Sequence, residues 1–69
     1  MKHFKRINND YRSLYRGSAE YRLYKSPVKG FKYVIYAKEY DYETGVYQYI
    51  SQGLFQSIES AEGYLNRRG

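Results

Sequence analysis

Aromatic residues and cations alternate along residues 11–25, YRSLYRGSAEYRLYK, which makes this stretch the first candidate for chemistry in the chain. A cation follows a tyrosine four times, in Tyr11-Arg12, Tyr15-Arg16, Tyr21-Arg22 and Tyr24-Lys25. Cations neutralise phosphates and tyrosine rings stack on bases, so the pattern suits a flat, anionic partner such as a nucleic acid. Because adjacent residues of a helix or strand point apart, each tyrosine could equally face a core while its cation faces water.

Positive charge is concentrated in the first thirty residues. The 69-residue chain has a net charge of +5. Residues 1–30 contain eight Lys/Arg and two Asp/Glu, whereas residues 31–69 contain four Lys/Arg and five Asp/Glu. A basic half of this kind predicts a polyanion partner. The candidate phosphate contacts are Arg12, Arg16, Arg22, Lys25, Lys29, Lys32 and Lys38, and the candidate stacking rings are Tyr24 and Tyr36.

Catalytic and metal chemistry find little support in the residue types. His3 is the single histidine and the chain has no cysteine, so we predict no enzyme activity, no catalytic residue and no cofactor. Glu39, Asp41 and Glu43 alternate and could attract a cation. Charge that discourages pairing at a hairpin tip explains them as well, and we predict no metal site.

Two strands and a turn are predicted in the middle of the chain. Residues 30–40 alternate with period two and are rich in aromatic and β-branched residues, which indicates a strand. The DYETG segment at 41–45 predicts a turn with Gly45 at positive φ, and 46–52 the returning strand. Upstream, 18–25 reads either as a strand or as a helix, and the sequence leaves this open.

A helix is predicted over residues 57–68. Ser57 is a favourable N-cap, and Ile58, Ala61 and Leu65 recur at helical spacing. For residues 1–19 we predict either a basic arm or a short helix over 11–16. Asn8, Asn9 or Asp10 would cap this helix.

The predicted fold class is α+β in a single domain, residues 1–69. It consists of a three-stranded antiparallel meander over 20–52, the helix 57–68 packed on one face, and the short N-terminal helix or arm. The core is predicted to contain Phe31, Ile35, Ile58 and Leu65, and the open face Lys32, Tyr36, Lys38 and Tyr40.

Residues 30–66 also carry a motif pattern: a glycine before an aromatic-rich strand, a D-x-x-T-G turn, a second strand and a capped helix. The matching positions are Asp41, Thr44, Gly45, Phe55, Ser57, Ala61, Glu62 and Leu65. This pattern resembles the arm-type DNA-binding domain at the N-terminus of phage and transposon tyrosine integrases. The resemblance implies a sheet that enters the DNA major groove. The second strand, 46–52, departs from that family because it contains no Lys or Arg.

Two functions of different class follow from these observations. The first is a small non-enzymatic nucleic-acid-binding module, with DNA preferred over RNA, that uses the basic half and the open sheet face. The alternative is a phage-type protein that binds an acidic surface of a host or defence protein and inhibits or modulates it. A homodimer through the open face is a third outcome. The sequence shows no apolar run of about 18 residues and no secretory signal, so we expect a cytoplasmic location, the host cytoplasm if the chain is phage-encoded, and no membrane contact.

Overall fold

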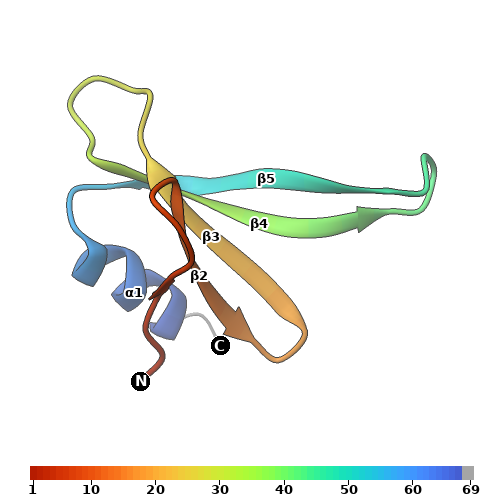
Figure 1. The fold of residues 1–69 in the computed structure, drawn as a ribbon, viewed down its shortest axis with the longest axis horizontal. Coiled ribbons are helices and arrows are strands. Elements are labelled where there is room, and N and C mark those ends of the chain that lie inside the picture. The colour runs from red at the N-terminus through yellow and green to blue at the C-terminus, as the bar shows by residue number, and fades with distance from the viewer. Residues whose placement is uncertain (68–69) are drawn as a thin grey trace.

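The computed structural model describes residues 1–67, which form a five-stranded antiparallel sheet with one helix on one face (Figure 1). The elements are β1 (Lys5–Arg6), β2 (Tyr11–Arg16), β3 (Ala19–Lys25), β4 (Tyr33–Asp41), β5 (Val46–Phe55) and α1 (Ile58–Arg67). The strand order is β1-β2-β3-β4-β5, so every connection joins neighbours. The predicted three-stranded meander over 20–52 is therefore wrong, since two more strands precede it and β5 continues to Phe55.

Residues 11–16 form strand β2 and not the short helix or arm that the sequence predicted. The spacing of Tyr11, Leu14 and Tyr15 fits one helix face, but a helix of six residues is unstable without packing. As a strand, the segment pairs with β3 along its whole length and buries Leu14. Gly17 and Ser18 make the two-residue connection to β3, with Gly17 at a φ of 61°, the conformation that glycine supplies at the first position of a hairpin turn.

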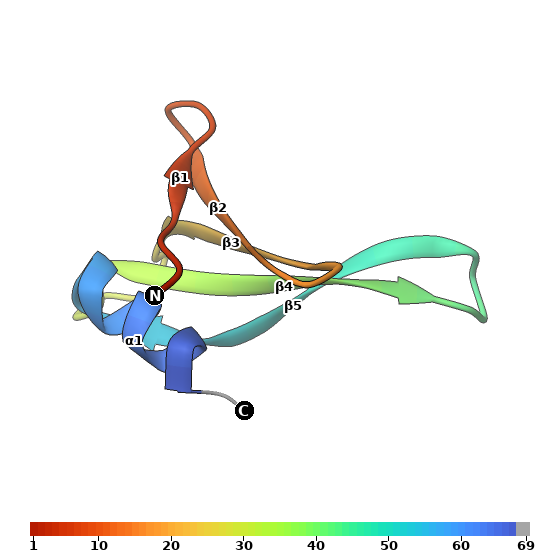
Figure 2. The ribbon, with the colours of Figure 1, turned by 90° about the horizontal axis from the view of Figure 1, so that it is seen from below.

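Asn8 closes the link between β1 and β2, where the sequence predicted a helix cap. Its Oδ1 accepts hydrogen bonds from the backbone N–H groups of Asp10 and Tyr11, at 2.8 and 3.2 Å. This is the local bonding by which asparagine favours turns. The resulting β1–β2 hairpin stands up from the plane of β4 and β5 (Figure 2).

The segment left open between strand and helix, 18–25, is occupied by strand β3, which pairs with β2 on one side and β4 on the other. The predicted turn at 41–45 is confirmed. Gly45 has a φ of 74°, and its N–H donates to the carbonyl of Asp41 at 2.8 Å.

The helix packs over one end of the sheet and forms the core there. Ile35 and Leu65 are completely buried and Ile58 packs against them, as predicted, but Phe31 precedes β4 and is 42% exposed. The predicted N-cap is confirmed, because the Ser57 hydroxyl accepts a hydrogen bond from the N–H of Ser60 at 3.0 Å. The predicted helix end at residue 68 lies outside the described residues.

Glu62 of α1 fastens the N-terminal segment to the helix. Its Oε2 accepts a hydrogen bond from the N–H of Phe4 at 2.7 Å, and its Oε1 lies 3.1 Å from Nδ1 of His3. The side chain of Phe4 is consequently buried in the core. Across residues 1–67, no helix has the length and apolar character needed to cross a membrane.

Candidate functional site

The strand register divides the seven predicted site residues that lie in strands between the two faces of the sheet. Side chains alternate along a strand, so paired positions share a face. The face opposite the core, here called the tyrosine face, carries Tyr11, Tyr15, Tyr24, Tyr36, Tyr40, Tyr47 and Tyr49 together with Arg22 and Lys38. The face that also carries α1 holds Arg6, Arg12 and Lys25. Together with Lys32, which lies just before β4 and lines a hollow with Lys25, they form a second group, here called the basic cluster.

The rings of the tyrosine face pack on one another. Tyr11 stacks on Tyr24 with ring centroids 5.3 Å apart, and Tyr24 meets Tyr36 edge to face at 5.7 Å. Farther along, Tyr40 and Tyr47 make an edge-to-face pair at 5.2 Å. Tyr24 and Tyr36, predicted as stacking rings, are half-buried by these contacts, whereas Tyr47 is 60% exposed.

Arg22 is held at the centre of the tyrosine face. Its guanidinium carbon lies 4.5 Å from the ring centroid of Tyr11 and 5.0 Å from that of Tyr49. Its Nε donates a hydrogen bond to Oε2 of Glu20 at 3.1 Å, and the Ser13 hydroxyl donates to the same oxygen at 2.8 Å. Arg22 is thus neutralised within the chain and is poorly placed to contact phosphate.

The ionisation of this pair follows from the same contacts. Burial alone would raise the pKa of Glu20, but the hydrogen bonds from Arg22 and Ser13 and the charge of Arg22 outweigh it, so the pKa of Glu20 is lowered. Burial likewise disfavours the charged form of Arg22, yet its hydrogen bond to Glu20 raises its pKa. Both groups are therefore charged at neutral pH.

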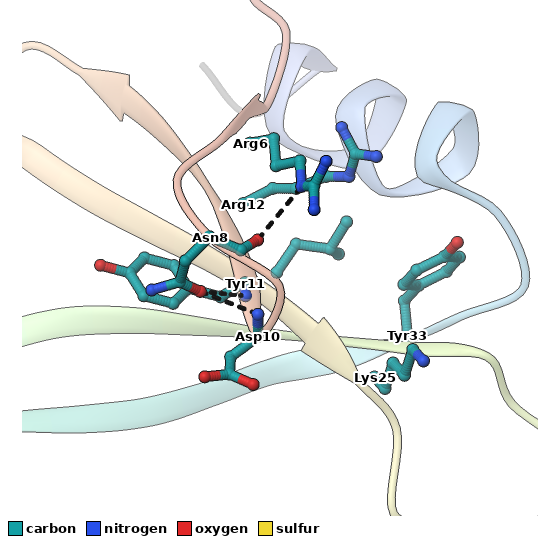
Figure 3. A pocket seen from close by; sticks show the side chains of 8 residues that line it. Arg6, Asn8, Asp10, Tyr11, Arg12, Lys25 and Tyr33 are labelled. Carbon is teal, nitrogen blue, oxygen red and sulfur yellow. Dashed lines mark hydrogen bonds between the residues drawn. The ribbon is translucent and has the colours of Figure 1, made fainter.

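Arg6, Arg12 and Lys25 of the basic cluster line a hollow of about 150 Å³ (Figure 3). Its lining consists of Arg6, Asn8, Asp10, Tyr11, Arg12, Leu23, Lys25 and Tyr33. Lys25 and Tyr33 also line a neighbouring hollow together with Ser26 and Lys32. The two hollows thus share a wall, and four cations border one continuous surface.

Charges in the basic cluster are not balanced by carboxylates. Arg6 and Arg12 occupy paired positions of β1 and β2, and their guanidinium groups lie close together in Figure 3. Arg6 donates to the backbone carbonyl of Asn8 at 3.4 Å and to the side chain of Asn9, both of which are neutral. Within residues 1–67, no ion pair reaches any of the four cations, and the carboxylate of Asp10 points away from the two guanidinium groups.

The remaining predicted residues lie outside this cluster or beside it. Lys29 is exposed in the loop that joins β3 to β4, near Lys25 and Lys32 in the chain. Arg16 is at the far end of β2, next to the turn, and Lys38 lies over the ring of Tyr47 at 4.6 Å. The sequence did not indicate Arg6 as a site residue, since only the pairing of the two-residue strand β1 brings it to Arg12.

Metal binding gains no support from the geometry, because residues 1–67 contain no group of three or more His, Cys, Asp or Glu side chains that could hold an ion. Comparison of the chain with protein-family models, with curated proteins and with solved structures found no match. The observations that bear on function are therefore the tyrosine face and the basic cluster.

Proposed function

We propose that the protein is a small non-enzymatic module that binds DNA in the cytoplasm and contacts the phosphate backbone through its basic cluster. The observation that carries this proposal is the gathering of Arg6, Arg12, Lys25 and Lys32 around connected hollows with no carboxylate paired to them. Like charges placed opposite each other on neighbouring strands are destabilising. Phosphate groups between them would remove that cost and gain charge-assisted hydrogen bonds.

The shape and donors of the hollow suit a phosphate group. At about 150 Å³ the hollow is several times larger than the space that one water needs, which leaves room for a phosphate. Arg12 offers a planar set of N–H donors, and the half-buried Tyr33 stands on the opposite side of the hollow (Figure 3). Direct phosphate contacts of this kind fix position without reading sequence, so we propose binding with weak sequence preference.

The test is the salt dependence of DNA binding, measured by fluorescence anisotropy with a labelled duplex and a labelled single strand. Each phosphate contact contributes about 0.9 to the log–log slope for a duplex and about 0.7 for a single strand. Lys25→Gln combined with Lys32→Gln should flatten the duplex slope by about 1.8. The matched control is Lys2→Gln combined with Lys5→Gln, which removes the same charge from exposed lysines outside the cluster and should leave most of the slope in place.

Two results would contradict the proposal. One is no binding of either DNA at about 50 mM salt, where electrostatic attraction is strong. The other is an equal loss of slope in the cluster variant and in the control, because binding would then follow net charge alone. Tighter binding of RNA than of DNA would keep the phosphate contact and change the assigned target.

The tyrosine face favours a second candidate function, binding to a protein. Its central cation is paired with Glu20, while Tyr15, Tyr47 and Tyr49 are 58%, 60% and 43% exposed. Tyrosine is enriched at the energetic centres of protein interfaces. Submicromolar binding to one protein, together with no DNA binding, would make an inhibitor or modulator of that protein the better assignment.

A further inference from the structure

Strand β5 forms one edge of the sheet, and its outer half, residues 46–51, lacks the usual protection of an edge, since the register shift in its pairing with β4 lies farther along, near Gly53. The ten residues of β5, VYQYISQGLF, include no charged residue and no proline, and among residues 1–67 the strand pairs with β4 alone. Natural edge strands are normally short, charged, bulged or covered, because their free N–H and C=O groups recruit other strands. The opposite edge follows that rule: β1 has two residues, Lys5 and Arg6.

The outer half of β5 exposes large apolar and aromatic side chains on both faces. The β4–β5 hairpin extends well beyond α1 (Figure 1), so the helix does not cover it. Val46 and Ile50 are 54% and 44% exposed on one face, and Tyr47 and Tyr49 are exposed on the other. A shift in register near Gly53 separates this part of β5 from the part under the helix.

We propose that two copies of the chain associate by pairing β5 with β5 in antiparallel orientation. A two-fold axis perpendicular to the sheet makes this contact self-complementary and closes the assembly at two copies. The sheet becomes continuous across the pair, with both tyrosine faces on one side and both helices on the other. The proposal does not depend on DNA binding, because no residue of the basic cluster belongs to β5.

The register follows from which backbone groups face outward. The N–H of Gly45 donates a hydrogen bond to the carbonyl of Asp41 inside the hairpin, which indicates that Asp41 and its partner Val46 direct their backbone groups toward each other. By alternation, Gln48 and Ile50 also face β4. Tyr47, Tyr49 and Ser51 instead present their backbone groups to the outer edge. An axis at Gln48 pairs Val46 with the second copy's Ile50, and Tyr47 with the second copy's Tyr49.

Electrostatics favour a second copy as the occupant of this edge. Each chain carries a net charge of +5, so two copies repel wherever basic surfaces meet. The β5 edge contributes no formal charge, and the register places apolar side chains opposite apolar side chains and ring opposite ring. Such cross-strand pairs are stabilising, and aromatic pairs are among the stronger ones.

Sedimentation of the full chain between about 5 µM and about 500 µM tests the association, since this range brackets a micromolar dissociation constant. We expect the mass to rise from 8.3 kDa toward twice that value. Val46→Lys should weaken the dimer by about tenfold or more, or about 1.4 kcal/mol. Val28→Lys is the matched control, since Val28 is 46% exposed in a loop and should leave the dimer intact.

A monomeric parent across this range, or equal effects of the two lysine variants, would overturn the proposal. Cross-linking tests the register separately, because the chain has no cysteine of its own. Gln48→Cys should oxidise to a covalent dimer much faster than Thr44→Cys, which lies in the hairpin turn. Equal rates of cross-linking would overturn pairing about Gln48.

Discussion

Glu20 and Arg22 form an ion pair two residues apart on strand β3, with Arg22 Nε 3.1 Å from Glu20 Oε2. The carboxylate is 8% exposed and also accepts the hydroxyl of Ser13 from β2. The pair therefore joins two strands while the guanidinium orders the rings of Tyr11 and Tyr49 above it. The rings of Tyr11 and Tyr49 thus depend on this arginine being held in place.

The lowered pKa of Glu20 makes the stability of the fold dependent on pH. Because the folded pKa lies below the unfolded value of about 4.3, the stabilisation is complete above that value and is lost as the pH falls through the folded pKa. Glu20→Gln should cost about 1–3 kcal/mol at pH 7, since it leaves Arg22 without its charged partner. Urea denaturation should show the gap between parent and variant narrowing toward pH 3; a gap of constant size would contradict this role.

The free energy of unfolding of core variants should distinguish the observed core from the predicted one. Ile35→Ala and Leu65→Ala should each cost about 2–5 kcal/mol, because both side chains are completely buried between sheet and helix. Phe31→Ala should cost much less, since this ring is 42% exposed ahead of β4. Urea denaturation of the three variants measures the difference. A loss at Phe31 as large as that at Ile35 would show that the exposed ring packs in solution.

The sequence was a good guide to the second half of the fold and a poor one to the first. Residues 30–66 combine period-two alternation, a turn glycine and a capped helix, and each of these signals is local. The N-terminal strands depend on contacts that are not local. The clamp of Glu62 on Phe4 and the pairing of β2 with both β1 and β3 show that residues 1–16 belong to the sheet. The glycine-serine turn at 17–18 was the one available signal for the β2–β3 hairpin.

The candidate site could be predicted by residue type but not by arrangement. Each Tyr-Arg pair does send its two members to opposite faces, as alternation requires. The direction is not the same for every pair: Arg12 and Lys25 lie on the side of the helix, whereas Arg22 lies on the tyrosine face. The register of pairing decides this direction, and composition carries no information on it. The predicted cations are therefore divided between the basic cluster and the tyrosine face, two surfaces with different properties.

Gly63 offers a test of how closely α1 approaches the sheet. A Cβ at this position would meet only the side chain of Arg67, with Nη1 at 3.0 Å, and that flexible end can move aside. The close approach that would require glycine here is thus not present among the described residues. Gly63→Ala should stabilise the protein by up to about 1 kcal/mol, the usual gain in a helix interior, in urea denaturation. Destabilisation would show that the helix needs the missing side chain.

Repulsion between Arg6 and Arg12 should be measurable in the stability of the free protein. The two residues are paired across β1 and β2, and neither forms an ion pair among residues 1–67. The Debye length falls from about 30 Å at 0.01 M salt to about 3 Å at 1 M, so added salt should stabilise the parent by relieving the repulsion. Arg12→Gln should reduce that gain, whereas Lys29→Gln, at an exposed loop position, should preserve it.

Phosphate provides the sharper form of this experiment. If the basic cluster binds phosphate groups, sodium phosphate should raise the urea midpoint of the parent more than sodium chloride does at equal ionic strength, because binding to the folded state adds to screening. The excess should disappear in Arg12→Gln and persist in Lys29→Gln. Equal stabilisation by the two salts in the parent would mean that the cluster does not bind phosphate. The proposal that Arg6 and Arg12 contact the DNA backbone would then be wrong.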